Sequence, residues 1–416
     1  MIIHVYGLGF VGLTTALALA NKKFKIVGYD TDHEKIKNLD KKKLPFYEEK
    51  LDKVLSRNLN KNFFVNKKKV NQNIDLNFVC VGTQDSKKSD FAQTSLLRKC
   101  FTNIINEENK YKKKIIVIRS STPPLTTEKI LLPILKKSKK KNIEIVYFPE
   151  FLAEGKAWKD FHKTQRIVIG LQNLNSKSFF IKLFKKFKFK IAFTNIRTAE
   201  FVKYLTNCLL STLISFSNEF RDIAERISDI EIKKAFKILQ TDQRWFSRDN
   251  NFNYYTFPGC GFGGSCLPKD LRSIIDTSIK YGGYNPKILS QVQNYNVNIF
   301  SNIVNNIAKE IKNKKTKIGI LGLSFKPNTD DVRGSPTAKI IPLLIKKGYK
   351  NLVAHDPISI QTFSKNYKSL KINYEQNINK IISDCEKLII VTSWDVYKKK
   401  LVGDIKDKII DLRYLV

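Results

Sequence analysis

The chain has 416 residues, with 75 Lys and Arg against 38 Asp and Glu, and a formal net charge of +37. Its length and its 42% content of hydrophobic residues predict two or three domains with real cores rather than a disordered chain. No apolar run approaches the roughly 20 residues that a membrane-spanning helix needs, and the first residues read as a strand and not as a leader. We therefore expect a cytoplasmic protein with no membrane partner.

The basic excess could indicate a nucleic-acid-binding protein. The lysines are spread over the whole chain, however, in runs such as Lys139–Lys141 and Lys398–Lys400, and no nucleic-acid motif interleaves them with aromatic residues. We therefore expect no nucleic-acid partner. The six cysteines form no C-x-x-C pair and the four histidines have no ligand spacing, so we expect neither a disulfide framework nor a metal site.

The N-terminal segment carries a dinucleotide-binding pattern. An apolar run leads into the segment GLGFVG, a helical stretch follows over Leu13–Ala20, and a second strand ends at Asp30. Strand, glycine turn, helix, strand and acid stand in the order that a Rossmann unit requires. The residues predicted to meet the cofactor here are Gly7, Gly9, Phe10, Val11, Gly12 and Asp30.

Each position in this pattern has a physical reason. Gly7 allows the tight turn, Gly9 lets a pyrophosphate approach the helix N-terminus, and Gly12 lets helix and strand pack closely. Asp30 is expected to accept hydrogen bonds from the adenosine ribose. A carboxylate there repels a 2′-phosphate, and neither Thr31 nor Asp32 supplies a cation, so the sequence favours NAD over NADP.

The order of elements occurs twice. Further β-rich runs follow over Leu76–Thr83, Lys114–Thr122 and Ile143–Phe151, and the C-terminal third repeats the opening with KIGILGLSF and a run that ends at Asp356. The fold class expected is α/β, with two Rossmann-like, doubly wound parallel-sheet domains joined by a long central helix. The second copy lacks the full glycine signature, so we expect it not to bind a dinucleotide in the same way.

Between the two copies the apolar spacing is helical for many turns. This places an NAD-binding domain at 1–195, a central helical domain with a cysteine loop at 196–311, and a C-terminal Rossmann-like domain at 312–416. A long helix with a wide apolar face favours a homodimer through that helix. The alternative is a monomer in which the two domains cover the face.

Five separated segments carry the polar residues that could do chemistry. Because open α/β sheets bind ligands at the carboxyl ends of their strands, several of these loops could converge on one cleft. They are GFGGSCLPKD with Cys266, Lys269 and Asp270; PEFLAEG with Glu150 and Glu154; the helical pair Lys203 and Asn207; FKPNTDDVRGSP with Lys326, Asp330, Asp331 and Arg333; and RSST with Ser120 and Ser121.

These segments, in this order, resemble the nucleotide-sugar dehydrogenase family over essentially the whole chain. The resemblance implies a four-electron oxidation of a sugar C6 alcohol to a carboxylate with two NAD per turnover. Cys266 would form a thiohemiacetal and then a thioester. The substrate favoured is UDP-glucose, giving UDP-glucuronate; UDP-N-acetylglucosamine, UDP-N-acetylmannosamine and GDP-mannose are alternatives.

The same resemblance implies the other roles. Lys203 would stabilise an oxyanion, Asn207 would add a donor, and Asp270 would orient Lys203 or the hydrolytic water. Glu150 and Glu154 would position or activate that water. It further assigns a set of contact residues: Phe151, Leu152, Phe262, Gly263 and Lys326 with Glu154, Lys203 and Asn207 on the substrate side, and Thr83, Ser121 and Arg333 on the cofactor side.

Two departures from the family pattern affect these expectations. Ser121 stands where the family commonly has threonine, which keeps the hydroxyl. The segment Thr241–Phe257 is longer than in the UDP-glucose enzymes, so the arginine expected to reach the sugar is Arg244, with Arg248 as an alternative. A one-step β-hydroxyacid-type dehydrogenase shares the two-domain plan and stays open as a second reading.

Overall fold

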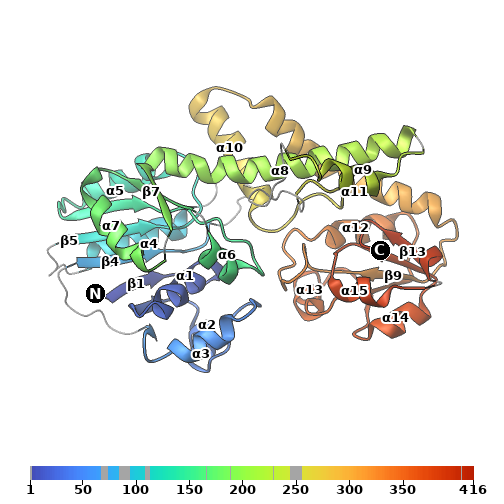
Figure 1. Cartoon of the computed structure of the whole chain (residues 1–416), viewed down its shortest axis with the longest axis horizontal. Coiled ribbons are helices and arrows are strands. Elements are labelled where there is room, and N and C mark those ends of the chain that lie inside the picture. The colour runs from blue at the N-terminus through green and yellow to red at the C-terminus, as the bar shows by residue number, and fades with distance from the viewer. Residues whose placement is uncertain are drawn as a thin grey trace. The chain divides into compact units, whose positions relative to one another are not determined.

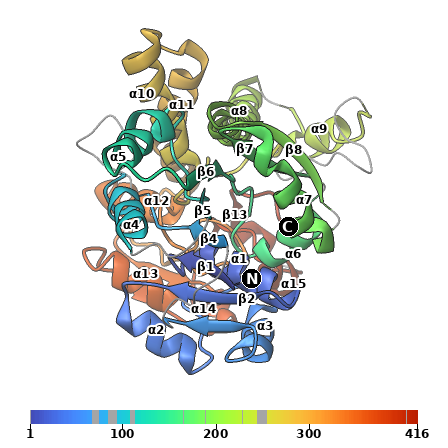
Figure 2. The ribbon, with the colours of Figure 1, turned by 90° about the vertical axis from the view of Figure 1, so that its left-hand side faces the viewer.

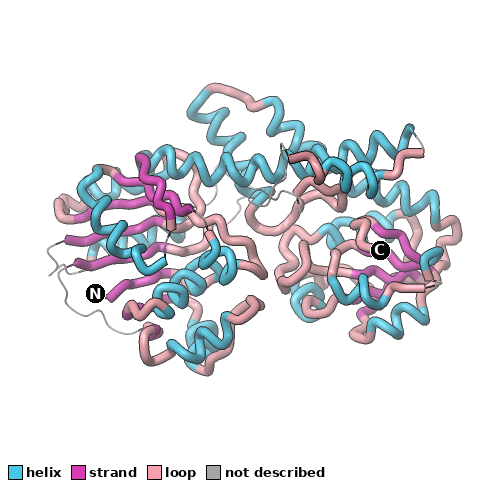
Figure 3. Tube along the Cα trace, in the orientation of Figure 1, coloured by secondary structure: helices cyan, strands magenta, loops and turns pink. Residues whose placement is uncertain are grey.

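The computed structural model describes residues 2–66, 74–83, 94–107, 113–164, 166–187, 189–227, 229–243, 255–403 and 405–416. The chain divides into two compact units (Figure 1). The first comprises Met1–Thr206 with Asp276–Gly283, and the second comprises Asn207–Ile275 with Tyr284–Val416. Each unit contains one sheet, and Figure 3 separates strands from helices by colour.

The sheet of the first unit has eight strands in the order β3-β2-β1-β4-β5-β6-β7-β8. The first six positions are those of a Rossmann sheet, and only the β6–β7 pair is antiparallel. The strands are β1 (Ile2–Tyr6), β2 (Lys25–Tyr29), β3 (Phe63–Val65), β4 (Ile74–Val79), β5 (Lys113–Ile118), β6 (Ile143–Tyr147), β7 (Arg166–Leu171) and β8 (Lys190–Asn195).

Helices cover both faces of this sheet, and each face has its own hydrophobic core. Figure 2 shows α4 and α5 on one side of the strands and α6 and α7 on the other. The helices are α1 (Phe10–Asn21), α2 (His33–Asp40), α3 (Leu51–Asn58), α4 (Ser95–Asn106), α5 (Leu132–Lys137), α6 (Ala157–Lys163) and α7 (Lys177–Phe184), with short helical turns over Thr127–Leu131, Leu174–Ser176 and Lys185–Phe187.

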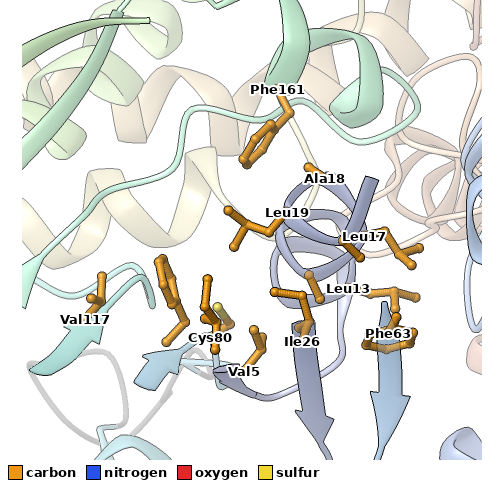
Figure 4. Packing of buried hydrophobic residues seen from close by; sticks show 14 of the residues in the cluster. Val5, Leu13, Leu17, Ala18, Leu19, Ile26, Phe63, Cys80, Val117 and Phe161 are labelled. Carbon is orange, nitrogen blue, oxygen red and sulfur yellow. The ribbon is translucent and has the colours of Figure 1, made fainter. Parts of the chain in front are cut away.

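Helix α1 is apolar on nearly all sides, as a helix enclosed by other elements must be. Leu13, Leu17 and Leu19 are fully buried, and Figure 4 shows them beside side chains of the neighbouring strands such as Val5 and Ile26. This packing fixes the end of α1 that follows the glycine turn.

The second unit repeats the arrangement on a smaller scale. Its five-stranded parallel sheet has the order β11-β10-β9-β12-β13, which is the order 3-2-1-4-5 of the first sheet. The strands are β9 (Ile318–Leu321), β10 (Leu352–His355), β11 (Asn373–Tyr374), β12 (Lys387–Ile390) and β13 (Ile409–Asp411), and the helices are α12 (Pro336–Lys346), α13 (Ile360–Asn366), α14 (Ile378–Asp384), α15 (Asp395–Lys400) and a turn over Lys406–Lys408. The prediction of two Rossmann-like domains is confirmed.

The acid that ends the second strand differs between the copies. In the first unit, Asp30 accepts from the backbone N–H of Leu8 at 2.8 Å and stays partly accessible. In the second unit, Asp356 is buried and accepts from the N–H of Leu323 and Ser324 and from Trp394 Nε1 at 3.1 Å. The turn after the first strand is therefore tied to the acid in both copies.

Four helices lie between the two copies in the chain: α8 (Ile196–Ile227), α9 (Ile232–Leu239), α10 (Leu267–Gly282) and α11 (Lys287–Glu310). Helix α8 has 32 residues, so the prediction of a long central helix is confirmed. Its residues up to Thr206 belong to the first unit and the rest to the second. Within the described part of the chain, none of the helices combines the length and the apolar composition that crossing a bilayer would take.

Candidate active site

The glycine turn between β1 and α1 has the geometry that a bound pyrophosphate needs. Gly7 has φ +88°, and a Cβ on it would lie 2.8 Å from the carbonyl oxygen of Cys80. A Cβ on Gly12 would overlap the carbonyl of Gly7, whereas a Cβ on Gly9 would meet nothing within 4 Å. Gly9 therefore faces open space at the N-terminus of α1, where no side chain caps the helix, so the backbone fits an anionic dinucleotide.

Asp30 closes this region at the end of β2. Burial raises the pKa of its carboxyl, but hydrogen bonds from Lys35 and from the N–H groups of Asp32 and Leu8 lower it more, and the net shift is downward. Lys35 Nζ lies 2.8 Å from Asp30 Oδ2. The sequence argument considered only Thr31 and Asp32 as sources of a cation beside Asp30, and it missed Lys35, which lies in the first turn of α2.

The ends of β4 and β5 bring two predicted residues together. Thr83 donates its hydroxyl to the backbone carbonyl of Ser121 at 2.8 Å. The Ser121 hydroxyl in turn lies 3.4 Å from Glu150 Oε1, just after β6. Neighbouring parallel strands thus place their C-terminal side chains on one edge, as the sequence predicted.

Glu150 and Lys203 form a buried ion pair. Lys203 Nζ lies 2.9 Å from Glu150 Oε1, and each side chain is only 4% exposed. Burial raises the pKa of Glu150, but the Lys203 ammonium, together with the N–H of Leu152 at 2.8 Å, brings it below its usual value. The Phe151 ring lies 5.6 Å from Lys203 Nζ. Two residues given separate roles from the sequence are therefore in direct contact.

The loop after Glu150 is held by an acid that sequence reasoning missed. The buried side chain of Glu48 accepts from the N–H of Gly155 at 2.9 Å and of Trp158 at 3.1 Å. Gly155 has φ +77°, a conformation that favours glycine. Glu48 therefore fixes the backbone next to Glu154, although nothing in the local sequence of Glu48 signals this distant partner.

In the second unit, Cys266 lies on the surface immediately before α10. Its carbonyl accepts from the N–H of Asp270 at 2.8 Å in the first turn of that helix, and Ser265 Oγ lies 3.6 Å from Cys266 Sγ. The positive end of the α10 dipole favours an anionic sulfur at this position. The arrangement suits a nucleophilic thiol.

Asp270 is fully buried, and both its oxygens bind neighbouring side chains. Asn207 Nδ2 lies 2.6 Å from Asp270 Oδ2, and Lys269 Nζ lies 2.6 Å from Oδ1. Asn207 follows Lys203 by one turn of α8, the spacing predicted from the sequence. Lys269, which the sequence left without a role, is the counter-ion of Asp270.

The glycines before Cys266 lie against the segment 325–334. A Cβ on Gly263 would overlap the carbonyl of Gly334, and the N–H of Gly264 donates to the carbonyl of Arg333 at 3.0 Å. A Cβ on Gly264 would lie 2.9 Å from the Phe325 ring. The sequence predicted only that several of the five segments could converge, and the glycines are what allows the backbones of these two to touch.

Three further predicted residues lie around these glycines. Phe262 is buried at 5% exposure. Lys326 Nζ lies 5.5 Å from the Phe325 ring, and the guanidinium of Arg333 is held by both oxygens of Asp331. Arg244 and Arg248 lie outside the described residues. Among the described residues, no group of three or more His, Cys, Asp or Glu side chains is placed to hold a metal ion.

Comparisons with known proteins agree along the whole chain. Sequence models of the UDP-glucose/GDP-mannose dehydrogenase family match at residues 1–188 (NAD binding domain), 197–298 (central domain) and 319–416 (UDP binding domain). The chain is similar to a UDP-glucose 6-dehydrogenase of Rickettsia felis, at 32% identity over 100% of this chain and 93% of that protein. It is 30% identical to UDP-glucose 6-dehydrogenase TuaD of Bacillus subtilis, covering 97% and 86%.

A solved structure supports the same grouping. The fold resembles a UDP-glucose dehydrogenase from Pyrobaculum islandicum with a TM-score of 0.88 and 27% identity, covering 100% of this chain and 94% of that one.

Proposed function

Since the chain belongs to the UDP-glucose/GDP-mannose dehydrogenase family and is an NAD-dependent nucleotide-sugar dehydrogenase, we propose that its substrate is UDP-glucose and its product UDP-glucuronate. The observation that carries the four-electron chemistry is the surface thiol of Cys266 at the start of α10, beside the buried group of Asn207 and Asp270. The names of full-length relatives at 30–32% identity support the choice of sugar.

NAD, when bound, accepts a hydride from the sugar C6 carbon in each oxidation. We assign its pyrophosphate to the turn of Gly7, Gly9 and Gly12, with Phe10 and Val11 at the start of α1, and its ribose to Asp30. Thr83 and Ser121 at the ends of β4 and β5, and Arg333, complete the proposed cofactor contacts.

The thiol carries the second oxidation. The Cys266 sulfur forms a bond to the aldehyde carbon while its proton goes to the aldehyde oxygen, giving a thiohemiacetal. Loss of hydride from that carbon and of the hydroxyl proton leaves a thioester. Water then adds to the thioester carbon, the carbon–sulfur bond breaks, and the products are the carboxylate, the thiol and a proton released to solvent.

Charged and amide groups support these steps. Lys203, paired with Glu150, and Asn207, held by Asp270, are the proposed donors to the oxygen on the reacting carbon. Glu150 and Glu154 are proposed to position the hydrolytic water. The remaining residues proposed to contact the substrate are Phe151, Leu152, Phe262, Gly263, Lys326 and either Arg244 or Arg248.

The test is a panel of nucleotide sugars with NAD, scored by acid formed and NADH released per sugar. We expect UDP-glucose to be preferred over UDP-N-acetylglucosamine, UDP-N-acetylmannosamine and GDP-mannose, with two NADH per sugar. No turnover of UDP-glucose, or preference for another sugar, would overturn the substrate. One NADH per sugar would overturn the thiol chemistry and favour a one-step dehydrogenase.

We propose that the regions 1–195, 196–311 and 312–416 serve for NAD binding, for dimer formation with the cysteine loop, and for nucleotide-sugar binding. A homodimer through α8 is supported by a row of half-exposed apolar side chains, one or two helix turns apart. These are Phe201, Leu205, Leu209, Phe216, Phe220, Ile223 and Ile227. The cytoplasmic location stays a prediction.

A further inference from the structure

A side chain on α11 binds both backbone groups of one residue in the loop that leads from Gly261 to Cys266. Asn296 Nδ2 donates to the carbonyl of Phe262 at 3.0 Å, and the N–H of Phe262 donates to Asn296 Oδ1 at 2.8 Å. A side-chain amide that meets both backbone groups of one residue does what a neighbouring β-strand would do. Phe262 lies four residues before Cys266, and Asn296 has no part in the chemistry proposed above.

The backbone before Phe262 and the Phe262 ring are both tightly packed. Gly261 has φ +69°, and a Cβ on it would overlap Asn296 Oδ1. The Phe262 ring is buried in a cluster with Cys208 of α8, Leu271 of α10 and Val292 of α11. The main chain of Phe262 therefore depends on Asn296, while its ring is held independently by packing.

Two more contacts continue the path to the thiol. The N–H of Gly264 donates to the carbonyl of Arg333, and the carbonyl of Cys266 accepts from the N–H of Asp270. The loop is thus fixed at every second residue: at Phe262, Gly264 and Cys266. Of these three attachments, only the one at Phe262 is made by a side chain, so it alone can be removed by a single substitution.

We propose that Asn296 is a positioning residue that sets the path of the loop from Phe262 to Cys266 and hence the placement of the thiol. The inference rests on the proposed function in assigning the thiol to the second oxidation. Asn296 acts through the backbone and touches no reacting atom. Its loss should therefore impair the thiol-dependent oxidation of the aldehyde more than the first oxidation of the alcohol.

The first test compares Asn296→Ala with Asn298→Ala, an exposed asparagine of the same helix. For Asn296→Ala we expect kcat for acid formation to fall roughly 10- to 100-fold, because a misplacement of about 1 Å can cost on the order of 100-fold. The KM for NAD should change less than about twofold, since binding of the cofactor is not removed. Asn298→Ala should behave as wild type. Equal kcat values for Asn296→Ala and wild type would overturn the proposal.

A second variant keeps the proposal testable if the alanine variant folds poorly. Asn296→Asp retains an oxygen for the N–H of Phe262 but turns a second oxygen toward the Phe262 carbonyl. That contact is repulsive when the carboxyl is ionised and becomes a hydrogen bond when it is protonated. The activity ratio of Asn296→Asp to wild type should therefore rise as the pH falls. A ratio independent of pH would contradict the positioning role, because a merely structural defect lowers activity at every pH.

A measurement without substrate separates this inference from the proposed function. Hydrogen exchange of the Phe262 amide should accelerate at least about tenfold in Asn296→Ala, because its acceptor is gone, and unchanged exchange would overturn the inference. If wild-type protein forms no acid from any of the sugars, the proposed function fails while the exchange result still decides the role of Asn296. If acid forms and exchange is unchanged, the function stands and the role of Asn296 is wrong.

Discussion

At the residue scale, the acids of the candidate site are held by partners far away in the chain. Glu150 meets Lys203, which follows it by 53 residues, and Asp270 meets Asn207, which precedes it by 63. Glu48 holds Gly155, 107 residues further on. Breaking a buried ion pair leaves a charge without compensation, so these contacts keep the polar groups in defined places.

Cys266→Ser tests the nucleophile. A serine hydroxyl is a much weaker nucleophile than a thiolate, so acid formation should fall by roughly a thousandfold or more. NAD binding and the melting midpoint should be retained, because the side chain is exposed. Acid can be quantified by chromatography and NAD binding by titration. Cys100→Ser is the matched control, and full acid production by Cys266→Ser would rule out the covalent route.

Asp30→Asn tests the choice of cofactor. Removing the carboxylate ends its repulsion of a 2′-phosphate, while Lys35 stays beside the site to attract one. We expect the kcat/KM ratio of NAD to NADP to fall roughly tenfold or more, the effect of about 1.4 kcal/mol. Steady-state kinetics with both cofactors measure it. The double variant Asp30→Asn with Lys35→Ala should lose the gain in kcat/KM with NADP. An unchanged ratio of kcat/KM for NAD to kcat/KM for NADP in Asp30→Asn would contradict the role of Asp30.

The sequence indicates the residues proposed to carry chemistry more readily than the residues that support them. Cys266, Lys203 and Asn207 stand in segments whose order and spacing are informative. Asn296 and Glu48 are ordinary polar residues in helical or loop sequence, and their partners are backbone groups that any residue could supply. Such contacts arise only when the chain is folded, so no local pattern indicates them.

At the scale of elements, α8 stabilises the helical segment that follows β5 by a capping contact. Glu200, on the first turns of α8, accepts from the N–H of Leu125 and of Thr127 and from the Thr127 hydroxyl at 2.7 Å. Burial raises the pKa of Glu200 to about 7. A carboxyl that titrates near neutrality thus lies three residues before Lys203.

The pH dependence of stability tests this cap. An unfolded glutamate has a pKa of about 4.3, so between about pH 4.3 and 7 the folded chain keeps a proton that the unfolded chain has lost. Stability contributed by this group is therefore present at low pH and declines as the pH rises toward 7. Glu200→Gln removes the titration. The melting midpoint of Glu200→Gln minus that of wild type should increase by about 4 °C or more when the pH is raised from 5 to 8.

The control for that experiment is Glu128→Gln, an exposed acid in the same helical segment that pairs with Arg197. Its melting midpoint relative to wild type should show no such rise between the same pH values. A Glu200→Gln difference that stays flat with pH would show that the carboxyl is ionised throughout.

At the scale of the whole molecule, the dimer proposal predicts a mass of twice the 48.1 kDa chain in light scattering. The variant Leu205→Glu with Leu209→Glu places two charges in the apolar row of α8 and should give the mass of one chain. Ile288→Glu, at an exposed apolar position on α11, should leave the dimer intact. A wild-type mass of one chain, or a dimer of the double variant, would contradict the proposal.

The sequence predicted the two-domain architecture better than it predicted the individual strands of each sheet. The strands of both Rossmann cores are short apolar runs that end in a turn or an acid, and the repeated order revealed two such cores. Strand β3 has three residues and β8 is largely half-exposed, so neither produces a distinct apolar run. Both were absent from the predicted elements for that reason.

The contrast between Asp30 and Asp356 has a consequence for how the two copies respond to substitution. Asp30 accepts a hydrogen bond from Leu8 and stays partly accessible, so a substitution there changes the turn and the surface offered to the proposed cofactor together. Asp356 is buried and accepts hydrogen bonds from Leu323, Ser324 and Trp394, so a substitution there acts on the packing of the second copy.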